Sequence, residues 1–182
     1  MKETRDGKMI TAPEWAVENI SERVFRLEQE RAIREILPHY TRCVDRGDFD
    51  GIASCYTEDG CFYPSDHSSP ITGKAAILSV FRKLMNPLPV TSMHYITNQQ
   101  IQFISDSEAI VFAYFFSNKS FEGEREDENT WGGYELRVIR EQDNEWRMKT
   151  HKCFFTRQTG SRSTRKAENR NRPWPPVPEY QE

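Results

Sequence analysis

The side chains best suited to moving protons near neutral pH are histidines, and the sequence contains four of them. His39, His67, His94 and His151 show neither the His-x-His nor the His-x-x-x-His spacing that places two metal ligands on one face of a strand or helix. The sequence also lacks a glycine-rich phosphate loop and a Gly-x-Ser-x-Gly elbow. We therefore expect no metal and no cofactor, and the chemistry must come from individual side chains.

Two segments carry the main indication of a site, His39-Tyr-Thr-Arg-Cys-Val-Asp-Arg-Gly-Asp-Phe49 and Val90-Thr-Ser-Met-His-Tyr-Ile-Thr-Asn98. An ionised Asp45 that accepts a hydrogen bond from one imidazole nitrogen of His94 would leave the other nitrogen free to take a proton from carbon. Tyr40 is a candidate hydrogen-bond donor to a leaving hydroxyl or an enolate oxygen. Residues five apart on a helix point about 140° from each other, however. From the residues alone, Tyr40 as a core aromatic and Asp45 as a turn residue beside an arginine are the simpler interpretation.

These segments resemble the SnoaL-like branch of the nuclear-transport-factor-2-like superfamily, which includes scytalone dehydratase, bile-acid 7α-dehydratase and hexachlorocyclohexane dehydrochlorinase. The resemblance covers roughly residues 22 to 157. In that branch an aspartate at the end of the first helix pairs with a histidine that opens the long strand, and Asp45 and His94 match those positions. A catalytic tyrosine five residues before the aspartate corresponds to Tyr40. The resemblance thus implies a catalytic trio of Tyr40, Asp45 and His94.

Other positions depart from that pattern. Asn118 stands nearest to the second catalytic histidine of scytalone dehydratase, and Tyr63 is one residue out of register with its pocket tyrosine. On the last strand, alternation predicts that His151, Cys153 and Phe155 face the cavity while Trp146 and Met148 pack elsewhere. His151 is a candidate for orienting a substrate or for a second acid. The remaining candidates for the cavity wall are Phe62, Phe81, Phe116 and Trp131. Together these aromatic residues favour an apolar, cyclic substrate, although for each alone an ordinary core residue is the simpler interpretation.

The periodicity of apolar residues predicts the elements that position these side chains. Helical spacing runs from Ser21 to Gly47, and Pro38 is expected to kink or divide this helix. Asp48 begins a short second helix, and a third follows Gly73 and buries Ile77, Leu78, Phe81 and Leu84. The predicted strands are 61–63, 93–104, 108–118, 131–140 and 146–155. This order predicts an α+β fold, and the family makes it a cone-shaped curved antiparallel sheet closed by the N-terminal helices.

Length and composition limit the classes of protein to consider. The 182 residues have a net charge of −3, which gives no reason to expect a nucleic acid or an anionic membrane as partner. There is no apolar run long enough for a membrane span and no signal-like start, so we expect a cytoplasmic protein with free thiols. We divide the chain into a polar N-terminal arm (1–20), the SnoaL-like α+β domain (21–157) and a Pro/Arg-rich C-terminal tail (158–182).

The leading functional prediction is a cofactor-independent lyase, most simply a dehydratase, that acts on a hydrophobic cyclic small molecule. The same Asp45 and His94 pair would serve an isomerase or a polyketide cyclase. The alternatives of another class are the non-catalytic β-subunit of an aromatic-ring-hydroxylating dioxygenase and a ligand-binding module. We expect a homo-oligomer because the open face of the sheet must be covered. The resemblance favours a trimer, with a dimer as the second choice.

Overall fold

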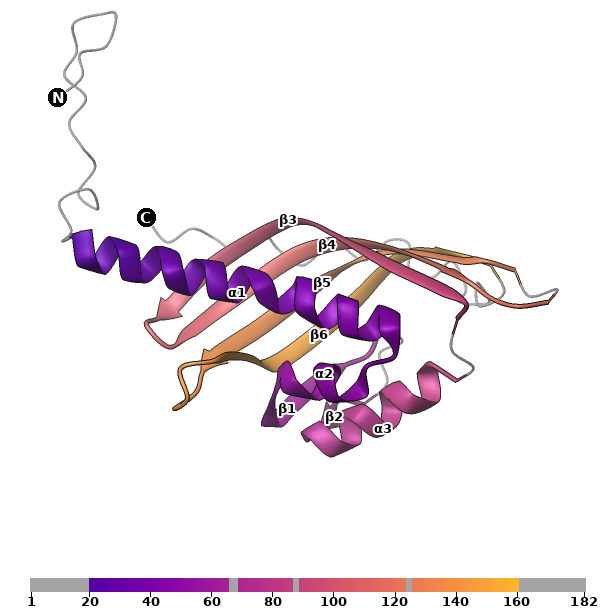
Figure 1. Cartoon of the computed structure of the whole chain (residues 1–182), viewed down its shortest axis with the longest axis horizontal. Coiled ribbons are helices and arrows are strands. Elements are labelled where there is room, and N and C mark those ends of the chain that lie inside the picture. Colours follow the sequence, from indigo (N-terminus) through magenta and orange to yellow (C-terminus); the bar gives the residue numbers. More distant parts are fainter. Residues whose placement is uncertain (1–19, 66–68, 87–88, 124–125, 161–182) are drawn as a thin grey trace, which may run out of the picture.

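The computed structural model describes residues 20–65, 69–86, 89–123 and 126–160 (Figure 1). All but the last residue of the predicted N-terminal arm and nearly all of the predicted C-terminal tail lie outside these ranges, as does His67. The helices are α1 (Ile20–Arg46), α2 (Phe49–Ser54) and α3 (Lys74–Leu84). The strands are β1 (Tyr56–Tyr63), β2 (Ile71–Thr72), β3 (Thr91–Ser105), β4 (Glu108–Ser120), β5 (Glu128–Arg140) and β6 (Trp146–Thr159).

The six strands form one open, curved sheet in the order β2-β1-β6-β5-β4-β3, and the helices lie on one side of it (Figure 1). The predicted α+β architecture is therefore confirmed, with one correction. β1 pairs with β6 in parallel, so the sheet is mixed rather than wholly antiparallel. The connection through β2 and α3 reverses the chain before β3, and three further reversals bring β6 back in the direction of β1.

The end of α1 is fixed by a glycine, as the sequence predicts. Gly47 has φ 66°, a left-handed conformation that favours glycine. Its N–H donates to the carbonyl of Val44 at 3.2 Å, and the N–H of Asp48 donates to the carbonyl of Cys43 at 2.9 Å. This pair of bonds is a Schellman motif, which ends the helix sharply and leaves Asp45 in its last turn. The Asp48 carboxylate then caps α2 by accepting from the N–H of Gly51 at 2.8 Å.

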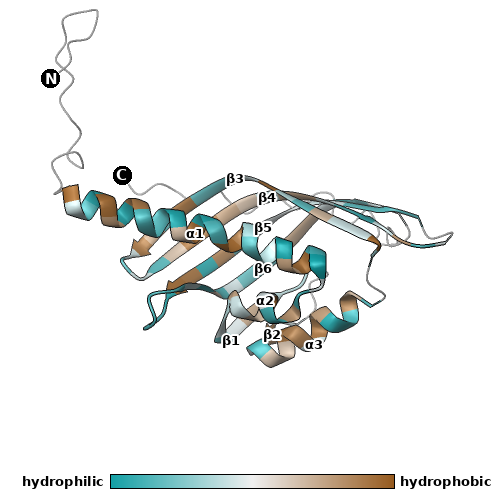
Figure 2. Cartoon of the chain, viewed as in Figure 1, coloured by the Kyte–Doolittle hydropathy of each residue, from teal (hydrophilic) through white to brown (hydrophobic). Residues whose placement is uncertain are grey.

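Pro38 does not divide α1, which is one continuous helix, so of the two predicted outcomes, a kink or a division, the division is wrong. A proline inside a helix has no N–H for the carbonyl four residues earlier, here that of Arg34. The side-chain amide of Gln99 on β3 donates to this carbonyl at 3.5 Å, and the Arg34 guanidinium donates to the carbonyl of Gln99 at 3.3 Å. The edge strand β3 therefore supplies the missing donor. Figure 2 shows α1 as alternating apolar and polar bands, as expected for a helix that packs on one side only.

Each long strand has an inner face towards the helices and an outer face on the opposite side. The inner residues of β4 are all buried: Ala109, Val111, Ala113, Phe115 and Ser117. Trp146 and Met148 also join this inner core, rather than packing elsewhere as predicted. β6 has one extra residue opposite the step from Arg137 to Val138. Met148 and His151 are three residues apart and would normally lie on opposite faces, but because of this extra residue both point inwards. Leu84, expected in the core, is exposed because it ends α3.

Candidate functional site

The side chains of Asp45 and His94 meet between the end of α1 and the start of β3. His94 Nδ1 lies 2.6 Å from Asp45 Oδ1, and the backbone N–H of His94 donates to Oδ2 of the same carboxylate at 3.0 Å. The Ser92 hydroxyl donates to Oδ1 at 2.7 Å. The two side chains are only 8% and 17% exposed, for His94 and Asp45 respectively. The structure thus holds this carboxylate and this imidazole together in a partly buried environment.

Local structure explains why these groups converge. Ser92 and His94 are two residues apart on β3 and therefore share its inner face. β3 is the last strand of the sheet, so the N–H groups on its free side have no neighbouring strand to bind. The Asp45 carboxylate, at the end of α1, takes one of these N–H groups as well as the imidazole. The aspartate therefore joins the helix to the sheet edge through two different bonds to one residue.

The hydrogen bonds determine the ionisation of Asp45 and the tautomer of His94. Burial alone would raise the pKa of Asp45, but the bonds from His94 and Ser92 outweigh it and lower the pKa below its usual value. An ionised carboxylate only accepts hydrogen bonds, so the proton in this contact is on Nδ1. The lone pair of neutral His94 is then on Nε2. Among the residues that the structure describes, no partner is found for this nitrogen.

The ring of Phe115 lies beside His94 on the inner face, with its centroid 6.2 Å from that of the imidazole. Phe115 stacks on Tyr134 at 4.5 Å and meets Phe155 edge-on at 6.0 Å. Proton abstraction by Nε2 would therefore take place beside an apolar surface, where water competes little with a substrate.

A second polar cluster lies deeper in the core, around His151. This side chain is fully buried, and its Nδ1 lies 2.6 Å from the hydroxyl of Tyr56. The ring of Tyr40 meets that of Tyr56 edge-on, with the centroids 6.3 Å apart. The rings of Tyr40 and Tyr134 both meet the His151 imidazole edge-on at 5.0 Å. Tyr134 and Phe115 are therefore the two rings that separate His151 from His94.

Burial keeps His151 neutral. It lowers the pKa of the imidazole to about 3, which excludes the charged form that the prediction of a second acid requires. If the Tyr56 hydroxyl donates to Nδ1, the ring proton of neutral His151 is on Nε2. That nitrogen is buried and has no partner within the described part of the chain. A buried donor without an acceptor costs about 1–3 kcal/mol, so this atom calls for an explanation.

The structure separates the predicted trio. Tyr40 packs edge-on against Tyr56 and Phe81 and belongs to the His151 cluster. No hydrogen bond or ring contact joins it to Asp45 or His94 in the described structure, although burial and, more weakly, the Asp45 charge raise the pKa of its hydroxyl. The angle between positions five apart on α1 accounts for this. Sequence analysis missed Tyr56, the residue that contacts both His151 and Tyr40. It is the first residue of β1, and the polar residues that follow it give no alternating pattern.

Four residues predicted at the cavity wall lie on the outer face instead. His94 pairs with Ser117, so Phe116 and Asn118 on either side of it point the opposite way. Phe116 pairs with Trp131, and the Asn118 amide donates to Asn129 at 2.8 Å on that outer face. Tyr63 pairs with Lys152 and follows the inward-facing Phe62. A shift of one residue in register moves every side chain of a strand to the opposite face. The predictions for these four residues are wrong by one such shift.

The other predicted wall residues do lie on the inner face. Phe62 and Phe81 are buried with their ring centroids 5.3 Å apart, and Phe62 pairs with His151. Phe155 pairs with Gly132 and packs against Phe115. Cys153 pairs with the inward-facing Tyr134 and therefore lies on the inner face as well.

No group of three or more potential metal ligands is found in residues 20–65, 69–86, 89–123 and 126–160.

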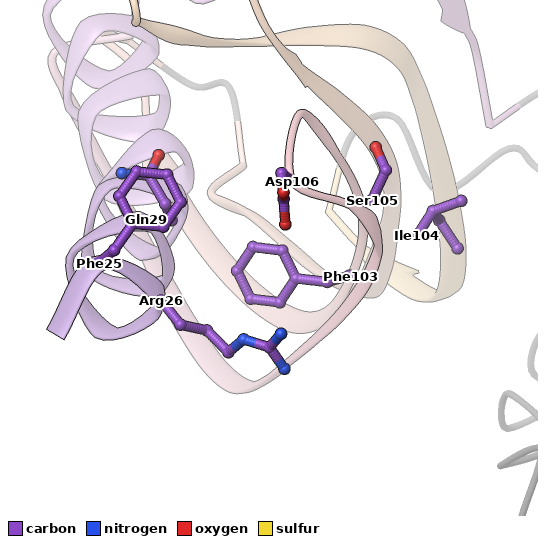
Figure 3. Close-up of a pocket in the computed structure, with 7 residues that line it drawn as sticks. All are labelled: Phe25, Arg26, Gln29, Phe103, Ile104, Ser105 and Asp106. Carbon is purple, nitrogen blue, oxygen red and sulfur yellow. The ribbon is translucent and has the colours of Figure 1, made fainter. Parts of the chain in front are cut away.

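Two recesses lie along α1. The smaller, of about 20 Å³, is large enough for a water molecule and includes Ser92, which binds Asp45, although neither Asp45 nor His94 lines it. Its lining residues are Val44, Leu84, Met85, Pro89, Ser92, Lys119, Phe121 and Glu128. The larger, about 190 Å³, lies at the other end of α1 (Figure 3). Phe25, Arg26 and Gln29 face Phe103 and Asp106 across it. At 1.5 Å per residue, Phe25 is about 30 Å along the helix from Asp45, so this groove does not serve the pair.

Comparison with known proteins identifies the family. The model of the SnoaL-like domain matches residues 26–152, and the chain therefore belongs to this family within the nuclear-transport-factor-2-like superfamily. No curated protein matches the sequence. No described helix is long and apolar enough to cross a membrane.

Solved structures share the fold. A protein from Novosphingobium aromaticivorans assigned as a scytalone dehydratase is 23% identical, with a TM-score of 0.68 over 74% of this chain and 89% of that one. Hexachlorocyclohexane dehydrochlorinase LinA-type3 from Novosphingobium barchaimii is 17% identical, with a TM-score of 0.67 over 75% and 92%. A protein from Novosphingobium aromaticivorans assigned as an aromatic ring hydroxylase is 22% identical, with a TM-score of 0.67 over 74% and 94%.

Proposed function

We propose that this protein is a cofactor-independent lyase that eliminates water, or a similar leaving group, from a hydrophobic cyclic molecule, with His94 as the base. The observation that carries the proposal is the bond of 2.6 Å between Asp45 Oδ1 and His94 Nδ1, which directs the lone pair of His94 to Nε2. The names of two similar structures, a dehydratase and a dehydrochlorinase, both denote eliminations, and this supports the choice of reaction.

The proposed reaction begins with removal of a proton from a carbon next to a carbonyl group. His94 Nε2 takes this proton, and Asp45 stabilises the imidazolium that forms because its carboxylate already accepts from Nδ1. The electron pair of the broken C–H bond forms a C=C bond as the bond to the hydroxyl on the adjacent carbon breaks. The imidazolium returns its proton to the departing hydroxide, and water leaves. The base is thus restored without any co-reactant.

His151 and its tyrosines are proposed to recognise an oxygen of the substrate. A neutral imidazole with its proton on Nε2 is a hydrogen-bond donor, and Tyr56 holds the ring in place through Nδ1. Such a donor can bind an oxygen of the substrate, and because two rings separate it from His94, that oxygen is not the carbonyl oxygen beside the carbon that loses its proton. A substrate oxygen would also satisfy a nitrogen that has no partner within the described residues. In this proposal Tyr40 acts as a positioning residue, because it touches Tyr56 rather than His94.

The decisive experiment follows the first chemical step rather than a particular product. Cyclic β-hydroxy ketones are incubated with the protein in D₂O, and mass spectrometry records deuterium at the α-carbon together with loss of water. Wild-type protein should catalyse exchange, and His94→Ala should reduce it to the uncatalysed rate. His39→Ala is the matched control, because His39 is exposed on α1 outside both clusters and its loss should leave exchange unchanged. Equal exchange by wild type and His94→Ala would refute the assignment of the base.

The same experiment separates the alternatives. Exchange without loss of water would favour an isomerase or a cyclase, which begin with the same deprotonation. A ligand-binding module or a dioxygenase β-subunit would bind such ketones, if at all, without exchange at any carbon. The similarity to a protein assigned as an aromatic ring hydroxylase keeps the β-subunit as the second candidate. Its specific test is co-purification with a Rieske-type α-subunit encoded beside it.

A further inference from the structure

A groove separates the first turns of α1 from the turn between β3 and β4 (Figure 3). Phe25 and Phe103 supply its aromatic rings, and Arg26 and Asp106 supply its charges. We call it the α1 groove. Its volume of about 190 Å³ is below the roughly 300–1,000 Å³ of sites that enclose a whole small molecule. A short segment of polypeptide, which inserts one large side chain, therefore fits this groove better than a free ligand.

The α1 groove exposes apolar surface on a fixed frame. Phe25 and Ile104 are 40% and 52% exposed, respectively. Phe103 packs edge-on against Trp146 with the ring centroids 6.3 Å apart. Gln29 accepts from the indole N–H of the same tryptophan at 2.8 Å, which ties α1 to the sheet. The groove is thus preformed, and an apolar side chain that enters it removes exposed aromatic surface from water.

The charges at the α1 groove are mainly positive. The Arg140 guanidinium lies over the Phe25 ring at 5.1 Å and donates to Gln29 at 3.5 Å. Arg26 has no carboxylate partner among the described residues. Asp106 supplies the single carboxylate among the seven described residues that line the groove. Two guanidinium groups and one carboxylate favour an occupant that combines an aromatic ring with negative charge.

The residues directly before α1 have this chemistry. Residues 9–19, which lie outside the described structure, are Met-Ile-Thr-Ala-Pro-Glu-Trp-Ala-Val-Glu-Asn. This pre-α1 segment contains one tryptophan and two glutamates but no lysine or arginine. Trp15 is five residues before Ile20 and can span up to about 17 Å from it. Because Phe25 is only about 8 Å along the helix from Ile20, the tryptophan can turn back to the groove.

The C-terminal tail fits the α1 groove less well. β6 begins beside the groove with Trp146 and ends about 40 Å away at Thr159. Trp174 is fifteen residues further on, so only an almost fully extended chain of about 50 Å would bring it back. Residues 161–182 also contain five lysines and arginines against three glutamates, an excess of the same sign as the groove. The segment attached next to the site has an effective concentration in the millimolar range, which favours it over a separate molecule as well.

We infer that the pre-α1 segment binds in the α1 groove. Trp15 occupies the space between the rings of Phe25 and Phe103, and Glu14 lies beside Arg26. The segment then joins the beginning of α1 to the end of β3, the two elements that hold the proposed catalytic pair at their opposite ends. The inference does not depend on the proposed reaction, because no residue of the groove belongs to either cluster on the inner face.

Cleavage by chymotrypsin after Trp15 tests the inference in the full-length protein. Mass spectrometry measures the rate of this cleavage, and a peptide of residues 9–19 gives the rate for the unbound sequence. Binding in the groove should slow the cleavage at least about 10-fold relative to the peptide, because a segment next to its own site is mostly bound. Arg26→Glu places like charges together and should abolish most of this protection, accelerating cleavage about 5-fold or more. Arg31→Glu is the matched control: it makes the same change at an exposed position of α1 that does not line the groove, and the rate should stay that of wild type.

A charge exchange tests the placement of the glutamate. Glu14→Arg combined with Arg26→Glu should restore the protection, measured against a peptide that carries the same substitution. Failure to restore it would overturn the contact between these two positions, provided that circular dichroism shows a folded protein.

Three results would overturn the inference as a whole. Equal rates for wild type and peptide would leave the α1 groove to the tail or to another molecule. Protection that is unchanged in Arg26→Glu would mean that the segment binds elsewhere. Protection that rises with protein concentration would assign the groove to the segment of a second copy.

Discussion

The substitution Asp45→Asn tests the central pair without requiring knowledge of the substrate. The carboxylate accepts from His94 Nδ1, from the Ser92 hydroxyl and from the backbone N–H of His94. An asparagine amide has one oxygen that accepts and one NH₂ group that only donates. If the NH₂ faces the backbone, the N–H of His94 loses its acceptor. If it faces the imidazole, Nδ1 must become the acceptor, and the ring proton moves to Nε2.

Either orientation removes at least one hydrogen bond to a charged group, which is worth about 1.5–3 kcal/mol. We therefore expect the free energy of unfolding at pH 7 to fall by about 2 kcal/mol. The second orientation also removes the base, since Nε2 then carries a proton. In a Ser-His-Asp triad the same change of tautomer costs about 10⁴-fold in rate. A comparable loss is expected for the exchange reaction proposed here.

Stability should also depend on pH in a defined direction. Hydrogen bonds outweigh burial and lower the pKa of Asp45 in the folded chain. Its contribution to stability is therefore fully present above the usual aspartate pKa of about 3.9 and is lost as the pH falls through the lower pKa of the folded state. The difference in unfolding free energy between wild type and Asp45→Asn should be largest near neutral pH and should narrow below about pH 4.

Urea titrations at several pH values measure that difference, and ¹⁵N NMR of the imidazole reports the tautomer of His94. Asp50→Asn, at an exposed position of α2, is the matched control and should change neither. Wild-type protein with the proton of neutral His94 on Nε2 would refute the reasoning directly. So would a stability difference that stays constant down to acid pH.

Further predictions concern the core and the faces of the sheet. Tyr56→Phe leaves the buried Nδ1 of His151 unpaired and should lower the unfolding free energy at pH 7 by about 1–3 kcal/mol, measured with urea. Burial lowers the pKa of His151 to about 3 in the folded chain, whereas the usual histidine pKa is about 6.5. The unfolding free energy should therefore decrease by about 1.4 kcal/mol for each unit that the pH is lowered between these two values. The same pH dependence in His151→Phe would contradict this. Gly47→Ala forces a side chain into a left-handed conformation and should lower the unfolding free energy by about 1–2 kcal/mol, which thermal melting would detect. Phe115→Ala should cost about 3–5 kcal/mol and Phe116→Ala clearly less, and equal losses in denaturation would show that the faces of β4 are assigned wrongly.

The helical part of the fold could be predicted because local chemistry determines it. Gly47 and Asp48 are strong signals for the end of one helix and the start of the next, and both act in that way. Pro38 is a strong signal too, but its effect depends on a distant residue. The Gln99 amide binds the carbonyl that the proline leaves free, and no local pattern predicts such a contact.

The candidate site was predictable only in part. The pairing of Asp45 with His94 came from the resemblance to a family, since neither residue alone distinguishes a site from a surface turn. The face of each β4 residue could not be deduced, because Phe115 and Phe116 are equally apolar and alternation gives no signal there. Tyr56 gives no strand signal, since the strand that it begins lacks the alternation on which a strand prediction depends.

The bond between Asp45 Oδ2 and the backbone N–H of His94 has a consequence beyond reactivity. An outermost strand with unoccupied amides is where foreign chains attach and aggregates begin. The carboxylate shields one such amide on the very residue whose ring it orients. Substitution of this aspartate would therefore free an amide at the sheet edge as well as the imidazole, and we expect it to make the protein more prone to aggregate.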